Sequence, residues 1–127
     1  MSGHVFTFWR NELHQRLAAL LVTIQDRSLS LKARIAELDI ATEKLALDFG
    51  KGRRGETNLS DEGANVLRMQ AQSIERERII MRTQIEKLAK ARTRAEVFIQ
   101  DAERASAFKR YKFDEADAAW LLGKELA

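Results

Sequence analysis

Residues 67–102 read LRMQAQSIERERIIMRTQIEKLAKARTRAEVFIQDA, and an apolar residue returns there at every seventh position. A second series follows four residues behind the first and is interrupted by Arg78 and Arg92. The first series is Leu67, Ile74, Met81, Leu88, Ala95 and Ala102, and the second is Ala71, Ile85 and Ile99. Paired series of this kind form a coiled-coil seam, so one long helix must lay a narrow apolar stripe against another helix.

The partner helix is predicted in the same chain, because residues 17–49 carry a matching pair of series. These are Leu17, Ile24, Leu31, Leu38 and Leu45, with Leu21, Ile35 and Phe49 behind them and Ser28 and Thr42 as polar gaps. Residues 48–59 between the two seams read DFGKGRRGETNL and hold three glycines, which is typical of a turn. The sequence therefore predicts an all-α fold: a long antiparallel two-helix coiled-coil hairpin with a short C-terminal helix.

The predicted single domain covers residues 1–127, with the first helix at about 8–47 and the turn at 48–59. The second helix is expected at about 60–112 and the terminal helix at about 114–126. The apolar run at the start is interpreted as too short for strand pairing. Because an antiparallel hairpin brings both of its ends together, the terminal aromatic residues are expected to form one cluster. They are Phe6, Phe8, Trp9, Phe108, Tyr111, Phe113 and Trp120.

Two helix registers fit the seams. Pairing residues whose numbers sum to 109 sets Leu45 against Ala64 and Leu21 against Leu88, and this register is preferred because its midpoint falls within Arg54 and Gly55. A register one heptad longer, summing to 116, is the competitor.

Composition favours a solvated helical protein. Charged residues make up 32% of the chain, proline and cysteine are absent, and the net charge is +3. Without cysteine, no disulfide or thiolate metal site can form, which agrees with a reducing cytoplasm. The apolar patch near residues 17–24 is shorter than half a membrane span, and the start of the chain does not have the pattern of a secretory leader. A cytoplasmic protein without a transmembrane segment is therefore expected.

Three glycines of the turn, Gly50, Gly52 and Gly55, match the dinucleotide-binding spacing G-x-G-x-x-G. That fingerprint needs a strand before it, whereas a long helix is predicted there, so we reject it. An anion site at the start of the second helix stays open as an alternative, through Lys51 and the neighbouring arginines at 53 and 54.

No catalytic arrangement emerges from the sequence. His4 and His14 are the only histidines, and neither has a nearby nucleophile or metal-ligand partner in the pattern. A two-helix hairpin offers no cleft that would raise the pKa of a carboxyl group. We therefore predict no enzymatic activity, no cofactor and no metal.

Protein binding is the predicted role. The first helix is apolar on more than one face, because Leu13 and Leu20 flank the seam; this broadened face is covered either by the chain or a copy of it, or by a partner protein. The candidate partner-binding residues are Phe8, Trp9, Leu13, Leu20, Arg53, Arg54, Arg110 and Trp120.

A small chain made almost wholly of a long antiparallel hairpin, with an arginine-rich second helix and joined ends, resembles the FliJ/YscO family of flagellar and type III secretion export. The resemblance covers residues of about 8–112. It implies a central stalk component for protein transport, whose terminal end enters an export ATPase ring and contacts the export gate. The residues at that end would be Leu13, Leu17, Leu20, Arg104, Arg110 and Trp120, and Arg53 and Arg54 at the far tip would be free for another partner.

Two other functions stay open. One is a homodimeric helical-bundle scaffold, in which two hairpins pair through the face of Leu13 and Leu20. The other is a nucleic-acid-binding protein that uses the basic face of residues 75–94. The sequence argues against the second, because no aromatic residues are interleaved there for base stacking.

Overall fold

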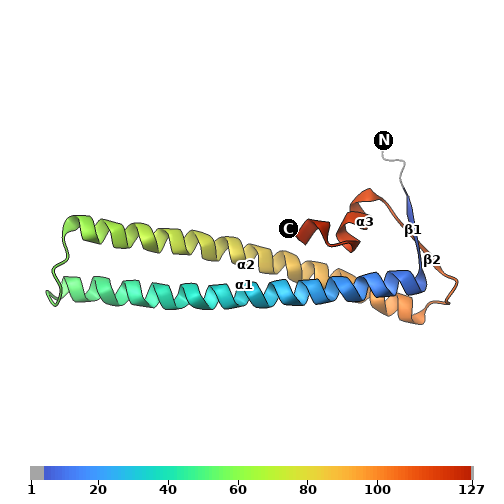
Figure 1. Cartoon of the computed structure of the whole chain (residues 1–127), viewed down its shortest axis with the longest axis horizontal. Helices are drawn as coiled ribbons and strands as arrows, with labels where there is room; N and C mark the ends of the chain where they lie inside the picture. The colour runs from blue at the N-terminus through green and yellow to red at the C-terminus, as the bar shows by residue number, and fades with distance from the viewer. Residues whose placement is uncertain (1–4, 127) are drawn as a thin grey trace. The chain divides into compact units, whose positions relative to one another are not determined.

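The computed structural model describes residues 5–126, and two long helices dominate it (Figure 1). In chain order the elements are strand β1 (Phe6–Trp9), helix α1 (Arg10–Arg53), helix α2 (Asp61–Arg104), strand β2 (Arg110–Phe113), helix α3 (Glu115–Leu121) and the 3₁₀ helix η1 (Lys124–Leu126). α1 and α2 pack against each other, so the predicted all-α hairpin with a short C-terminal helix is confirmed.

Contacts divide the chain into two compact units, which we describe separately. Unit 1 contains the residues up to Ser28 and those from Glu86 onward, and unit 2 is Leu29–Ile85. Both long helices contribute to both units, and the single domain stays a prediction.

The seam of unit 2 is made by the predicted heptad residues. Leu38 is buried, and Leu31, Ile35, Ile74 and Met81 are half-buried. Partial burial is expected because, in a pair of helices, each seam residue is covered only by the one facing helix. Arg78 interrupts the series and is half-buried as well, and its guanidinium lies 2.9 Å from the Asp39 carboxylate of α1.

Most cross-helix side-chain contacts depart from the preferred register, although Arg34 with Glu77 sums to 111 and lies close to it. Asp39 with Arg78, and Phe49 with Arg68, are pairs in unit 2 whose numbers sum to 117. His14 with Glu103 in unit 1 gives the same sum. These contacts agree with the competing register near 116, because the turn lies later in the chain than expected.

The predicted turn begins too early, since α1 continues to Arg53. Gly52 is helical and lies against Leu59, where an added Cβ would clash with the Leu59 side chain. Gly55 has φ +77° and ends the helix. The Glu56 N–H donates to the Lys51 carbonyl at 3.0 Å and the Gly55 N–H to the Gly52 carbonyl at 3.2 Å, which is the Schellman pattern.

Two strands form where none was expected. β1 pairs with β2 in antiparallel register, with Phe8 opposite Tyr111 and Trp9 opposite Arg110. The interpretation of the first residues as too short for pairing is therefore wrong, and so is the extension of the second helix to 112. Four residues suffice because the paired Phe8 and Tyr111 are both buried, and the burial of β2 alternates every second residue.

The expected aromatic cluster forms in unit 1 with a changed membership. Phe8 and Phe113 meet edge to face, with ring centroids 5.5 Å apart. Phe98 joins them from α2, at 5.4 Å from Phe113 and 5.8 Å from Trp120. Phe6, Trp9 and Phe108 are exposed and lie outside the core, so this part of the prediction is wrong.

The terminal helix is shorter than expected and ends at Leu121. Asp114 caps it by accepting a hydrogen bond from the Asp117 N–H at 2.8 Å. Gly123, with φ +75°, separates it from η1.

Candidate protein-interaction surfaces

The outer face of the β1–β2 ribbon presents a tryptophan and an arginine together. Trp9 is 44% exposed although it belongs to a paired strand. The Arg110 guanidinium lies 4.6 Å from the centre of the Trp9 ring, a cation–π distance. The Arg10 N–H, next in the chain, donates to the Lys109 carbonyl at 3.1 Å. The backbone on both sides of this pair is therefore hydrogen-bonded, which holds the two side chains in place.

Asp101 of α2 ties the start of β2 to the hairpin. Its Oδ2 accepts hydrogen bonds from the Tyr111 hydroxyl at 2.6 Å and from the Lys109 ammonium at 3.0 Å. The bond from Tyr111, and then the one from Lys109, lowers the pKa of the Asp101 carboxyl. Burial, followed by the bond to the carboxylate, raises the pKa of Tyr111. Because the ribbon is anchored in this way, Trp9 and Arg110 are presented on an ordered support.

Helix α3 is attached to α2 through Arg94. Its guanidinium donates to the Asp117 carboxylate at 2.6 Å and lies 4.0 Å from the centre of the Trp120 ring. Trp120 is 4% exposed, and its indole N–H is buried without a hydrogen-bond partner among residues 5–126. The indole is therefore held by packing and by the cation.

Half of the predicted partner-binding residues lie in the core of unit 1. Phe8, Leu13, Leu20 and Trp120 are all buried. The position of a Cβ on Gly123 would be 3.7 Å from a Leu20 methyl carbon, so the C-terminal segment lies against the face that sequence reasoning left open. A partner that bound Leu20 would have to displace this segment.

The other predicted residues are exposed, at two separate places. Trp9 and Arg110 share the ribbon in unit 1, whereas Arg53 and Arg54 lie at the turn in unit 2. Arg54 is paired with Glu56 at 3.2 Å. Of the glycines that match the dinucleotide spacing, Gly50 and Gly52 lie within α1 and Gly55 follows it, which is the wrong context for a phosphate-binding loop.

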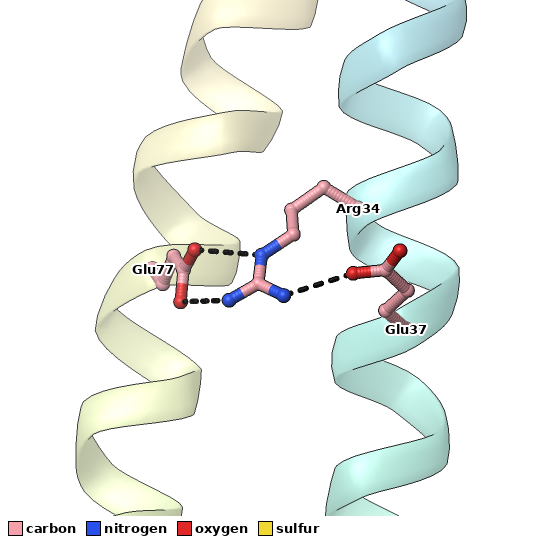
Figure 2. Close-up of polar contacts among 3 residues, drawn as sticks. All are labelled: Arg34, Glu37 and Glu77. Atoms are coloured by element: carbon pink, nitrogen blue, oxygen red, sulfur yellow. Dashed lines mark hydrogen bonds and ion pairs between the residues drawn. The ribbon is translucent and has the colours of Figure 1, made fainter.

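A cross-helix ion pair lies in the middle of unit 2 (Figure 2). Arg34 of α1 directs its guanidinium to Glu77 of α2, with Nε to Oε1 at 3.0 Å and a second nitrogen to Oε2 at 3.4 Å. Glu37 accepts from the third nitrogen at 2.9 Å. The bond to Glu77, and then that to Glu37, raises the pKa of Arg34. Arg34 and Glu37 are exposed and Glu77 is half-buried, so this contact contributes little to stability.

The described part of the chain contains no cluster of side chains around a histidine that resembles a metal site. His14 lines an open groove beside Arg10 and Glu103, and its Nε2 lies 3.7 Å from the Glu103 carboxylate. Within residues 5–126, no three His, Asp or Glu side chains converge as metal ligands would. His4 lies outside the described residues. The absence of enzymatic activity and of cofactors stays a prediction.

Sequence reasoning missed Phe98, Arg94 and Asp117, which build the contact between α2 and α3. Phe98 follows the seam residue Ala95 by one helical turn, and Ala95 and Ala102 make this part of the seam small. A bulky aromatic residue beside small seam residues was the available signal. It indicates that something packs across the flank of the helix pair.

None of the helices in the described residues combines the length and the apolar character needed to cross a membrane. The comparisons with known proteins find no match, whether to a family model, a curated protein or a solved structure.

Proposed function

We propose that this chain is a noncatalytic coiled-coil protein-interaction module that binds a partner protein through the outer face of the β1–β2 ribbon. The observation that carries the proposal is the exposed Trp9 ring stacked on Arg110 at 4.6 Å. Tryptophan and arginine are the residues most often found at the energetic centres of protein interfaces. An exposed pair of this kind presents a large, mostly apolar surface, and burying that surface against a partner is favourable.

The surroundings of this pair support the proposal. Val5, Phe6 and Phe108 belong to the same unit, and their side chains are also exposed, so unit 1 presents apolar surface beyond this pair. The hydrogen bonds from Tyr111 and Lys109 to Asp101 order the ribbon in the absence of a partner. Little conformational entropy would then be lost on binding, which favours affinity.

A more specific form of the proposal is the stalk of a flagellar or type III secretion export ATPase in the cytoplasm. Its support is the resemblance of the hairpin to the FliJ/YscO family. In this version the terminal end, which carries Trp9 and Arg110, enters the ATPase ring, and the export gate is a further partner. Arg53 and Arg54 at the turn would be available to that second partner.

The alternatives have less support. A bundle formed through Leu13 and Leu20 would require unit 1 to expose both residues, because both are buried. A nucleic-acid interface on residues 75–94 would leave the Trp9–Arg110 pair without a role. Titration with DNA at about 0.15 M salt tests it, since binding through phosphates weakens steeply as salt is added.

The experiment that tests the proposal is photo-crosslinking in the host cell. A benzoylphenylalanine placed at position 9 should crosslink one discrete protein, and the same probe at Met69 on α2 should not. Met69 is the matched control because it is an exposed apolar residue away from the ribbon. For the partner so identified, Trp9→Ala and Arg110→Ala should each weaken binding at least about tenfold, with helicity unchanged. Identical crosslinks at both positions, or unchanged affinities, would refute the ribbon as the binding site.

A further inference from the structure

The outer face of α1 in unit 2 carries a second heptad series, separate from the hairpin seam. Its members alternate at spacings of four and three residues and are Leu29, Ala33, Ala36, Ile40, Glu43 and Leu47. The three large apolar side chains of the series, Leu29, Ile40 and Leu47, are 55%, 67% and 61% exposed. Apolar side chains at this spacing are typical of a helix that packs along a second helix.

α2 does not cover this series. The seam toward α2 contains Leu31, Ile35 and Leu38, and Leu38 is buried there. Residues 29, 36 and 40 face away from the seam, as their exposure shows. α1 therefore has two apolar stripes in unit 2, and within the described residues only one of them has a partner.

The charged residues that flank the outer series are complementary to themselves. In a parallel, in-register pair of helices, the residue on one flank of the seam (position g) faces the residue five positions later on the other flank (position e) of the other copy. Lys32 would then face Glu37, and Asp39 would face Lys44, twice each by symmetry. Every charged flank from 32 to 44 finds an opposite charge.

We propose that the outer face of α1 in unit 2 binds a second copy of this chain, with the two α1 helices parallel and in register. Leu29, Ala33, Ala36 and Ile40 each meet their own counterparts along the two-fold axis. The small side chains of Ala33 and Ala36 let the two backbones approach closely at the centre.

Antiparallel pairing of the same faces is less favourable. The register that sets Leu29 against Leu47 also brings Glu37 beside Glu37 and Asp39 beside Asp39 of the other copy. The like charges at these flanking positions select against this register. A register one heptad away sets Leu29 against Ile40 and Asp26 against Glu43, so it has an acidic contact in the seam as the parallel pair has at Glu43, and the disulfide test below distinguishes the two.

The flanking carboxylates can accept a second partner in the dimer. Glu37 is bound by Arg34 and Asp39 by Arg78, yet the two acidic side chains remain 66% and 48% exposed. Each carboxylate has two oxygens and can accept from two cations at once. Glu43 destabilises the seam, because its carboxylate would meet the like-charged Glu43 carboxylate of the other copy.

Sedimentation velocity of the full chain from about 1 µM to 0.5 mM tests the pairing. The wild type should pass from monomer to dimer in this range. Ile40→Asp should weaken the dimer about a hundredfold, because two carboxylates would enter the seam. Met69→Asp, which introduces the same charge on the exposed face of α2, should leave the dimer unchanged. A wild type that is monomeric at the top of the range, or equal effects of the two substitutions, would overturn the proposal.

Charge exchange tests the pairing without touching the apolar residues. Lys32→Glu and Glu37→Lys should each weaken the dimer, and the double exchange should restore it. The restoration depends on Lys32 meeting Glu37 of the other copy. A double variant weaker than both single variants would contradict that contact. Glu43→Leu should act in the opposite direction and strengthen the dimer at least about tenfold.

Orientation is read from disulfide formation, since the chain has no cysteine of its own. Ala36→Cys should form an intermolecular disulfide rapidly, because position 36 meets itself in the parallel pair. Gln72→Cys, at an exposed position of α2, is the control and should crosslink slowly. Equal rates would overturn the parallel arrangement.

This dimer does not rest on the ribbon proposal, and their failures can be distinguished. A monomeric wild type would remove the dimer and leave the Trp9 crosslinks unaffected. A stable dimer would leave the ribbon proposal in place but would argue against the stalk version, which takes one hairpin into each ring.

Discussion

Replacing Trp120 by alanine should detach the C-terminal helix from unit 1. The indole is 4% exposed, its centroid is 5.8 Å from that of Phe98, and the Arg94 guanidinium lies 4.0 Å from the ring centre. Truncation removes both contacts and leaves a cavity that the short helix α3 cannot close. Buried Trp→Ala substitutions of this type cost about 3–5 kcal/mol of unfolding free energy.

Trp120→Phe is the matched control. The buried indole N–H has no hydrogen-bond partner among the described residues, so the substitution breaks no hydrogen bond. A phenyl ring keeps an aromatic face for Arg94 and an edge for Phe98. The expected loss is therefore only about 1–2 kcal/mol, from reduced volume and a weaker cation–π contact.

Two measurements check this prediction. Urea unfolding followed by far-ultraviolet circular dichroism gives the free energies of the three proteins. Hydrogen exchange should show that Trp120→Ala removes protection from the amides of α3, including the Leu122 N–H that bonds to the Ala118 carbonyl, while the amides of unit 2 stay protected. A loss below about 1 kcal/mol for Trp120→Ala, or equal losses for the alanine and phenylalanine variants, would refute the reasoning.

The remaining predictions concern two charged residues. Because the pKa of Asp101 is lowered in the folded state, its carboxylate stabilises unit 1 above the ordinary value of 3.8, and this stabilisation is lost as the pH falls through the lowered pKa. Urea unfolding below about pH 5 should therefore show a steeper loss of stability for the wild type than for Asp101→Asn, and parallel curves would contradict this. Arg78→Leu should leave the free energy of unfolding unchanged or raise it by up to about 1 kcal/mol. The reason is that the half-buried guanidinium has a buried Nε without a hydrogen-bond partner in the described chain. Urea unfolding measures this, and a loss of more than about 1 kcal/mol would disprove it.

The long helices could be predicted because their signal is local and repeated. Each heptad adds an independent apolar residue, so a gap such as Arg78 does not erase the pattern. The end of α1 was harder, because Gly50 and Gly52 are residues that usually mark turns. Gly52 is helical and its lack of a side chain leaves room for Leu59, whereas Gly55 takes the positive φ that closes the helix. That choice depends on a contact across the turn, which single-residue preferences do not contain.

The ribbon could not be predicted with the same certainty, because its strands are short and far apart in the chain. FTFW at 6–9 and RYKF at 110–113 each show a two-residue alternation, which is too brief to separate a strand from a helix end. The alternation indicates strands only when the two segments are compared as a pair. Phe8 and Tyr111 then match as buried partners, and Trp9 and Arg110 as outward ones. The candidate site therefore depends on a pairing between the two ends of the chain.

α1 has more apolar surface than α2 can cover, and the additional apolar residues are buried in unit 1 but exposed in unit 2. In unit 1 the extra residues Leu13 and Leu20 are buried within the unit, where the C-terminal segment reaches Leu20. In unit 2 the extra residues Leu29, Ile40 and Leu47 remain exposed, although they keep the heptad spacing. A solvated helix face gains nothing from regular apolar spacing, whereas a helix that packs on another requires it. The regularity of the exposed series, together with its self-complementary charges, is therefore better explained by an intermolecular helix contact than by chance.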